Sequence, residues 1–321
     1  MAADRDRTLK AIKKGHDFIV AAHVQPDGDA LGAALGLSLL LKKLGKNVVT
    51  AVDPNQVPAK YHFLPGIESV TWPRTFKADT LITVDVANPD RLGDSKPALE
   101  AVECVVNIDH HPDNALFGAV NWVEPETTST SEMILELWRA TGMTPTLNAA
   151  VCIYVGMLTD TGNWQYSNTT SGGLRAAADL IEIGVEPNKI FSHIYESNTT
   201  GWLRLMGLGL TAAVIDKDLR FAYAIVTRAD LEVAGAQAGE VENLVDWLRS
   251  LADVDIVLVI KETKTGEFKG SARSGGSIDV GALARLFNGG GHHNAAGFTT
   301  SEAPSLVVTR VKKWLTSTAS S

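Results

Sequence analysis

The chain has 321 residues, 45% of which are hydrophobic, and its formal net charge at pH 7 is −8. This length allows one large domain or two ordinary ones, and the hydrophobic content is enough for a full core. The acidic balance argues against a protein that grips long nucleic acid through its phosphates, whereas short or diffusible substrates fit it. No run reaches about 18 uninterrupted apolar residues, and the N-terminus is charged and helical, so we expect a cytoplasmic protein without a membrane span.

The first half of the chain alternates strands and helices. Apolar runs predict strands at 17–22, 47–52, 80–85 and 104–109, and helices are expected at 4–14, 30–44, 130–140, 146–158, 170–183 and 187–196. Continuous apolar strands are typical of a parallel sheet covered on both faces. The strand–helix–strand order of residues 17–52 implies a right-handed crossover in such a sheet.

The texture of the sequence changes in the second half. Strands at 221–227, 254–262 and 267–272, a Gly-containing hairpin turn at 264–266, and helices at 279–287 and 305–316 predict a smaller mixed sheet. We therefore expect an α/β fold in which a parallel-sheet domain with helices on both faces spans residues 1–196. A linker at 197–210 and a smaller mixed-sheet α/β domain at 211–321 follow, with the active site in the cleft between the domains.

The stretch AAHVQPDGDALG, at 21–32, carries the densest group of ligand-type residues. His23, Asp27 and Asp29 lie within seven residues, in the turn between a strand and a helix. An imidazole and two carboxylates in so small a space are not all buried without cations to offset their charge. Carboxylate oxygens mixed with imidazole suit Mn²⁺ or Mg²⁺ and also allow Zn²⁺ or Co²⁺.

Three later stretches supply matching groups at the ends of apolar runs. These are Asp85 in LITVDV, Asp109, His110 and His111 in VVNIDHH, and Asp160 in VGMLTDTG. Together these residues suffice for two ions about 3.5–4 Å apart, with Asp85 as the natural bridge, and such a pair activates water against a phosphoryl group. Taken singly, Asp29 could instead cap its helix and Asp160 could lie in a surface turn.

With these motifs the chain resembles the DHH phosphoesterases. The HxxxDxD motif at 23–29, the Asp of LITVDV, the DHH triplet at 109–111 and TDTG at 159–162 match the four motifs of that family in order and spacing. SARS at 271–274 and GGGHHNAAGF at 289–298 resemble the DHHA1 domain that accompanies one branch of it. Within the family the chain is most similar to the stand-alone hydrolases of very short RNA (nanoRNA) that also dephosphorylate 3′-phosphoadenosine 5′-phosphate (pAp).

The resemblance implies roles for the first-half motifs. One ion would be held by His23, Asp27 and Asp85, and the other by Asp29, Asp85, His110 and Asp160. Asp109 would orient a ligand by hydrogen bonding from behind the site. His111 would face the substrate phosphate, stabilising charge or protonating the leaving oxygen. The two ions are expected to be Mn²⁺, with Mg²⁺ or Co²⁺ as alternatives.

The second half would supply recognition of a second phosphate. Backbone N–H groups of Gly289, Gly290 and Gly291, with His292, would approach the anion, although a Gly-rich stretch alone is also typical of a plain turn. Arg273 offers a bidentate fork for a terminal phosphate. Arg91 is either a further phosphate contact or a solvated loop cation, and the role of His293 stays open.

The predicted function is a metal-dependent phosphoesterase that hydrolyses dinucleotides and nanoRNA to mononucleotides and pAp to AMP. Its partners would be short RNA fragments and nucleotide bisphosphates, with no long duplex, and the resemblance implies a homodimer. A cyclic-dinucleotide phosphodiesterase of the same family is one alternative, and a non-catalytic nucleotide-binding protein is another. A RecJ-like exonuclease would need more chain and a more basic channel, and the GGGHHNAAG motif disfavours a family II pyrophosphatase.

Overall fold

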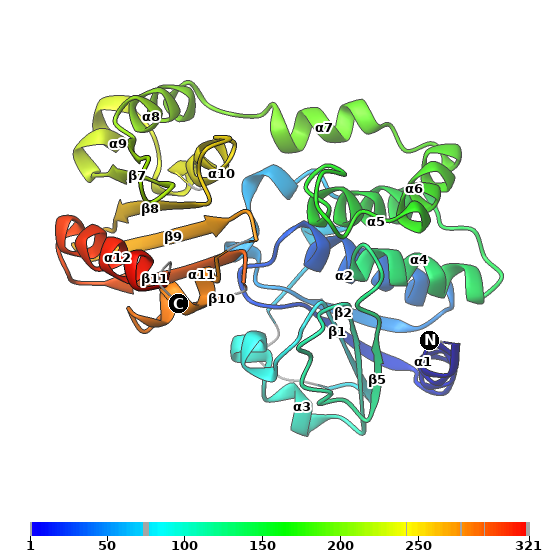
Figure 1. The fold of residues 1–321 in the computed structure, drawn as a ribbon. Coiled ribbons are helices and arrows are strands. Elements are labelled where there is room, and N and C mark those ends of the chain that lie inside the picture. Colours follow the sequence, from blue (N-terminus) through cyan, green and yellow to red (C-terminus); the bar gives the residue numbers. More distant parts are fainter. Residues whose placement is uncertain (1, 73–76, 242, 277, 292, 319–321) are drawn as a thin grey trace. The chain divides into compact units, whose positions relative to one another are not determined.

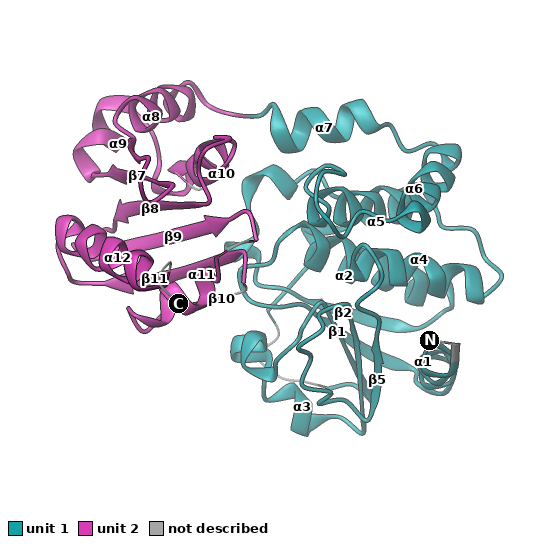
Figure 2. Ribbon diagram, in the orientation of Figure 1, with its two compact units in different colours: residues 1–197 teal, residues 198–321 magenta. Residues whose placement is uncertain are grey.

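The computed structural model describes residues 2–72, 77–241, 243–276, 278–291 and 293–318 (Figure 1). The chain divides into two compact units, residues 1–197 (unit 1) and residues 198–321 (unit 2), which are coloured separately in Figure 2. No helix in the described part of the chain is long and apolar enough to cross a membrane.

Unit 1 is built on a parallel five-stranded sheet. The strand order is β2 (Asn47–Ala51), β1 (Asp17–Ala21), β3 (Thr80–Val84), β4 (Cys104–Asp109) and β5 (Val120–Val123). All four neighbouring pairs are parallel. β3 is buried along its whole length, as expected for a strand with both faces covered.

Helices cover both faces of this sheet. The helices of unit 1 in the described residues are α1 (Ala2–Lys14), α2 (Gly28–Lys43), α3 (Ala98–Ala101), α4 (Thr130–Ala140), α5 (Leu147–Asp160), α6 (Ser171–Ile183) and α7 (Pro187–Tyr195), of which α6 packs on α4 and α5 rather than on the sheet. Val20 and Ile82 pack in the large cluster formed with α2, α4 and α5. Ile19 and Leu81, which point to the other face, pack in a smaller cluster with Leu92 and Ala98.

A close contact between α2 and α5 places the site. A Cβ on Gly32 would come within 2.4 Å of the Cys152 carbonyl oxygen, and one on Gly156 within 2.8 Å of Asp29 Oδ1. Only glycine allows two helices to approach so closely. This packing brings the start of α2, with Asp29, beside the end of α5, with Asp160.

Unit 2 contains a mixed six-stranded sheet. The strand order is β10 (Gly290–Gly291), β11 (Ala295–Thr300), β9 (Phe268–Ser274), β8 (Ile256–Glu262), β7 (Phe221–Val226) and β6 (Val214–Asp216). Only β7 and β8 run parallel. The helices assigned in this unit are α8 (Thr200–Thr211), α9 (Arg228–Ala234), α10 (Leu244–Arg249), α11 (Val280–Arg285) and α12 (Pro304–Thr318). α11 and α12 pack in one core cluster of unit 2, and α8, α9 and α10 pack in another.

The predicted fold class is confirmed: a parallel α/β sheet in the first half and a smaller mixed sheet in the second. The sequence interpretation missed α3, β5, β6, α9, α10, β10 and β11. β5 is only four residues long, and β11 begins with Ala-Ala-Gly, residues that do not favour strands. The segment 197–210, predicted as a linker, contains most of α8, and Leu205 and Met206 of this helix pack in the core of unit 2.

Candidate metal centre

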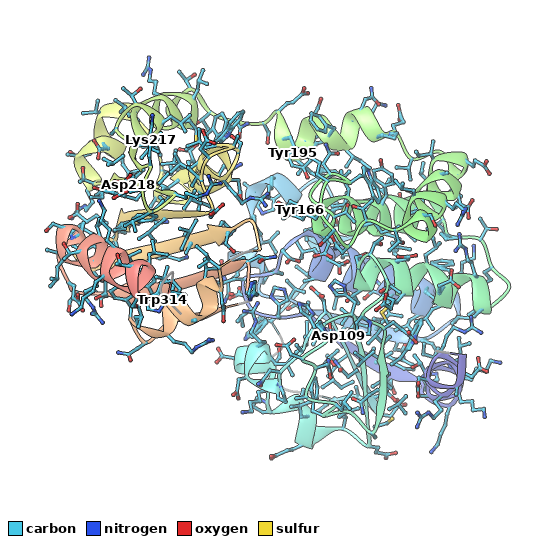
Figure 3. All side chains as sticks on the ribbon, viewed as in Figure 1. Asp109, Tyr166, Tyr195, Lys217, Asp218 and Trp314 are labelled. Carbon is cyan, nitrogen blue, oxygen red and sulfur yellow. The ribbon has the colours of Figure 1, made fainter. Side chains whose placement is uncertain are left out.

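Three of the predicted site stretches meet because their strands are neighbours in one parallel sheet. Ala21 of β1 is in register with Thr83 of β3, and Val84 of β3 with Ile108 of β4. The carboxyl ends of these strands therefore lie together, the edge at which open α/β sheets place ligands. His23, Asp85 and Asp109 follow or end the three strands; Figure 3 labels Asp109 within unit 1.

The two aspartates of the PDGD turn have different tasks. Asp27 is the N-cap of α2, and its Oδ1 accepts hydrogen bonds of 3.0 Å from the backbone N–H groups of Asp29 and Ala30. Its Oδ2 lies 3.9 Å from His23 Nε2. Asp29 enters the interior and is 1% exposed. The capping role that the sequence left open for Asp29 belongs to Asp27.

Asp85 lies between two groups of ligand-type side chains. Its Oδ2 is 3.6 Å from His23 Nε2, while its Oδ1 is 3.9 Å from His110 Nε2. Asp85 adopts a left-handed conformation with φ 59°, rare for a residue with a side chain, and its backbone N–H donates to the Ile108 carbonyl. Such a conformation at the end of β3 persists only where the surroundings hold it.

The potential ligand atoms form overlapping groups whose members lie within 4.8 Å of one another. The groups are His23, Asp27 and Asp85; Asp29, His110 and Asp160; and Asp85, His110 and His111. The first group is the set predicted for one ion. The second group contains three of the four residues predicted for the other ion; the fourth, Asp85, is grouped with His110 and His111 instead. The structure thus brings all six predicted metal ligands together at one edge of the sheet.

Asp109 lies behind the two histidines of the DHH triplet. It is fully buried, and its Oδ1 lies 2.7 Å from His111 Nδ1 and accepts a bond from the His110 backbone N–H at 2.9 Å. Asn114 donates to its other oxygen at 2.6 Å. Burial alone would lower the pKa of His111, but the bond to Asp109 and the charges of Asp85 and Asp160 raise it to about 9. In the metal-free protein His111 is therefore an imidazolium at neutral pH.

The carboxylates repel one another. Burial, followed by the charges of Asp85 and Asp27, raises the pKa of Asp160 to about 8. Burial and the charges of Asp85 and Asp160 likewise raise the pKa of Asp29 well above its ordinary value. Like charges in a poorly solvated site hold protons in this way unless a cation replaces them. Four carboxylates with two imidazoles are a donor set that fits divalent ions such as Mn²⁺.

The sequence interpretation missed the residues that hold these carboxylates in place. The backbone N–H groups of Thr130 and Ser131 donate to Asp29, and the Thr130 hydroxyl donates to Asp85. Asn168 donates to Asp160. The TTSTSE run at 127–132 indicated only the start of a helix, since nothing in it shows which distant side chain its donors meet.

Arg91 lies beside His23. Its Nη2 is 3.1 Å from His23 Nδ1, and its carbonyl accepts the Val24 N–H. His23 Nδ1 is also 2.8 Å from the Val24 carbonyl oxygen. In the tautomer that donates Nδ1–H to this oxygen, the Nε2 lone pair is directed to Asp27 and Asp85, as a metal ligand requires.

In unit 2 the predicted phosphate contacts lie on adjoining strands. Arg273 of β9 is paired with Ala295 of β11, and β11 in turn pairs with Gly290 and Gly291. Arg273 Nε lies 3.8 Å from Asp246 Oδ1, a neighbour that no sequence signal indicated. The Gly289 N–H donates to the Ala284 carbonyl, so this N–H is not available to a phosphate. His292 lies outside the described residues.

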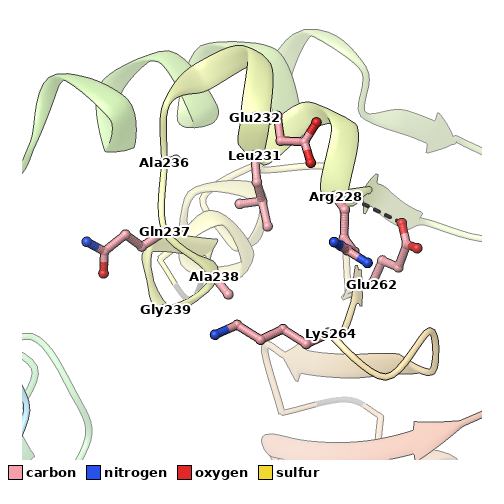
Figure 4. A pocket seen from close by; sticks show the side chains of 9 residues that line it. All are labelled: Arg228, Leu231, Glu232, Ala236, Gln237, Ala238, Gly239, Glu262 and Lys264. Atoms are coloured by element: carbon pink, nitrogen blue, oxygen red, sulfur yellow. Dashed lines mark hydrogen bonds between the residues drawn. The ribbon is translucent and has the colours of Figure 1, made fainter.

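Unit 2 also contains an open pocket of about 650 Å³ (Figure 4). Its lining includes Arg228, Glu232, Glu262 and Lys264, and the Arg228 backbone N–H donates to Glu262. Both signs of charge occur around it. None of the predicted site residues lines it.

Comparison with known proteins identifies the family. Residues 17–157 match the model of the DHH family N-terminal domain, and residues 219–317 match the DHHA1 domain. The bifunctional oligoribonuclease and PAP phosphatase NrnA of Thermus thermophilus is 33% identical over 91% of this chain and 86% of its own length. The chain belongs to the DHH family.

Two further relatives have similar coverage. NrnA of Bacillus subtilis is 28% identical over 90% of this chain and 91% of its own. The crystal structure of an exopolyphosphatase-related protein from Bacteroides fragilis is 26% identical and superposes with a TM-score of 0.92, covering 99% of this chain and 96% of that one. The family predicted from the four motifs and the GGGH stretch is confirmed.

The titration of Asp160 makes the metal-free protein sensitive to pH. Its raised pKa means that the folded state keeps, between about pH 4 and 8, a proton that the unfolded chain has released. The free energy of unfolding of chelator-treated protein should therefore fall as pH rises from 5 to 8. Thermal unfolding across this range measures the slope.

The Asp160→Asn variant removes one titrating group and should make the slope less steep, while the raised pKa values of Asp29 and His111 keep part of it. Mn²⁺ should restore stability at pH 8 in the unaltered protein. Asp113→Asn, at an exposed position, is the matched control. An Asp160→Asn variant with the same pH slope as the unaltered protein would contradict the account.

Proposed function

We propose that this protein is a divalent-metal-dependent phosphoesterase that hydrolyses short oligoribonucleotides to mononucleotides and pAp to AMP. The observation that carries the proposal is the position of Asp85. One oxygen of its carboxylate is directed to the His23–Asp27 side and the other to the His110 side. A carboxylate in that position is suited to bridge two ions, and His23, Asp27, Asp29, His110 and Asp160 would complete their ligands.

Two divalent ions bound there, of which Mn²⁺ fits the oxygen-rich donors best, would activate a water and neutralise the phosphoryl oxygens. The protein supplies the rest. In the metal-free protein the bond to Asp109 and the nearby carboxylates raise the pKa of His111 to about 9 against the effect of burial, and Asp109 fixes the ring through Nδ1. We assign His111 the donation of a proton from Nε2 to the leaving oxygen. Asn114 keeps the Asp109 carboxylate in place for this task.

Recognition of a second phosphate falls to Arg273 and the glycine stretch. The Arg273 side chain is one-third exposed, and its Nε lies 3.8 Å from Asp246 Oδ1, so a phosphate could displace that contact. Gly290 and Gly291, both exposed, would supply backbone N–H groups, and His292 a further donor. Arg91, beside His23, would meet the phosphate under attack. Two phosphates at a fixed separation would favour substrates of a few nucleotides.

The NrnA relatives carry both proposed activities in their names, which supports the assignment. Five further points stay predictions: the cytoplasmic location, a homodimer, two Mn²⁺ ions, a site between the two units and the exclusion of long duplexes. The division into catalytic residues 1–196, linker 197–210 and binding residues 211–321 also belongs to this proposal.

The first test is the Mn²⁺-dependent release of AMP from a diadenosine dinucleotide. Asp85→Ala removes the carboxylate proposed to contact both ions. It should reduce the rate by more than about 100-fold, because the loss of a hydrogen-bond partner outside the ligand shell already costs about 10- to 100-fold. Asp113→Ala, at an exposed position two residues after His111, should leave it unchanged. Chromatography of the nucleotides measures the rate.

The same assay with pAp, cyclic dinucleotides, pyrophosphate and longer oligomers separates the alternatives. Preferential cleavage of a cyclic dinucleotide would transfer the assignment to that substrate class. If the protein bound the dinucleotide but released no AMP with any divalent ion, it would be a nucleotide-binding protein rather than an enzyme.

The second prediction concerns Arg273. Arg273→Ala should raise KM for the dinucleotide about 10- to 150-fold, because a charge-assisted contact to phosphate is worth about 1.5–3 kcal/mol. The Mn²⁺ content should not change. Arg273→Lys should recover only part of the affinity, since an ammonium group cannot form the bidentate contact. Steady-state kinetics with metal analysis tests this, and an unchanged KM would remove Arg273 from the binding role.

A further inference from the structure

One short segment of unit 1 touches the ligand set predicted for the second ion. We call residues 127–131, which end with the first two residues of α4, the α4 entry segment. The backbone N–H of Thr130 donates to Asp29 Oδ2 at 2.7 Å and that of Ser131 to Oδ1 at 2.8 Å. The first N–H groups of a helix have no partner within the helix, and they favour a negative charge. Both oxygens of this buried carboxylate are therefore oriented by α4.

The entry segment also reaches Asp85 and His110. The Thr130 hydroxyl donates to Asp85 Oδ1 at 3.1 Å, and this is the oxygen nearer to His110. The Thr127 backbone also lies near the His110 ring. Residues 128–131 have no exposed surface, so packing holds these donors in place as well.

Asn168 extends the segment to the fourth ligand. Its Nδ2 donates to Asp160 Oδ2 at 2.9 Å and lies 2.9 Å from the Thr128 carbonyl oxygen, within hydrogen-bond distance of both. It also lies 3.2 Å from the Asp160 carbonyl oxygen. Asn168 thus connects the end of α5 to the entry segment. The oxygen of Asp160 that it contacts, Oδ2, is also the one that lies 3.6 Å from His110 Nε2.

The other half of the site lacks this support. Within the described residues, the side-chain hydrogen bonds of His23 and Asp27 go to Val24, Arg91, Asp29 and Ala30 and not to the entry segment. Asp27 caps its own helix and its side chain is 61% exposed, whereas Asp29 and Asp85 are buried. His23 Nδ1 lies 2.8 Å from the adjoining Val24 carbonyl oxygen and 3.1 Å from Arg91 Nη2. The two halves therefore differ in the exposure of Asp27 and in the segment that orients their ligands.

We propose that Asn168 and the α4 entry segment are positioning elements that build the Asp29–Asp85–His110–Asp160 pocket before any ion binds. The protein then takes one divalent ion tightly in this buried pocket and the second more weakly at His23 and Asp27. Ligands already held in their binding geometry lose little freedom on binding, which is the reason for the tighter affinity. The inference rests on the metal ligands of the proposed function.

The test is a calorimetric titration of the chelator-treated, full-length protein with Mn²⁺. The unaltered protein should bind in two steps. Asn168→Ala should weaken the tighter step about 10- to 100-fold and leave the weaker one, as expected for the loss of a partner outside the ligand shell. Asp27→Asn should weaken the other step and leave the tighter one.

A matched pair at Thr130 guards against simple misfolding. Thr130→Val keeps the shape and removes the donor to Asp85, so it should weaken the tighter step, whereas Thr130→Ser keeps the hydroxyl and should bind as the unaltered protein does. Raising the Mn²⁺ concentration should restore dinucleotide hydrolysis by Asn168→Ala, which a merely structural lesion would not allow.

Equal affinity of the unaltered protein for both ions would overturn the inference. Unchanged Mn²⁺ affinities in both Asn168→Ala and Thr130→Val would also do so. Neither result would affect the proposed hydrolysis itself. A protein that binds no divalent ion in either half would instead remove the proposed function, so the two failures are distinguishable.

Discussion

Electrostatic repulsion among carboxylates is the constraint around which unit 1 is organised. Asp29, Asp85 and Asp160 gather with His23, His110 and His111 at one edge of the sheet, and Asp29 and Asp85 have almost no access to water. A protein core excludes such a concentration of negative charge unless protons or cations neutralise it. The raised pKa values of Asp29 and Asp160 are the response to that strain in the metal-free chain. The site is therefore built for cations.

The fold supplies this edge through ordinary packing. Adjacent parallel strands bring three sequence motifs together, and glycines allow α2 and α5 to approach until Asp29 and Asp160 share the site. The start of α4 supplies neutral donors rather than further charges. Its N–H groups satisfy Asp29 without a cationic side chain, which leaves the net charge of the cluster for metal ions to offset. The backbone of Asp85 adopts a strained left-handed conformation, which places its side chain between the two halves of the site.

The sequence predicted the features that depend on residue type and spacing. It did not predict the features that depend on contacts between distant segments. The apolar runs predicted β1, β3 and β4, and parallel strand ends predicted that their acidic residues would meet. Asn168 and Thr130 could not be assigned, because a polar residue in a loop or at a helix start has no sequence signal for a partner 8 to 45 residues away. The tasks of Asp27 and Asp29 likewise needed coordinates, since either can cap α2. In unit 2, the three-residue β6 and the two-residue β10 fall below the length at which periodicity is informative.

The central claim is that Asp85 joins two cation sites. Anomalous diffraction from crystals grown with Mn²⁺ tests it most directly, because it locates each ion without reference to activity. The account predicts two peaks about 3.5–4 Å apart, each within ligand distance of a different oxygen of Asp85. A single peak, or two peaks of which neither contacts Asp85, would contradict it.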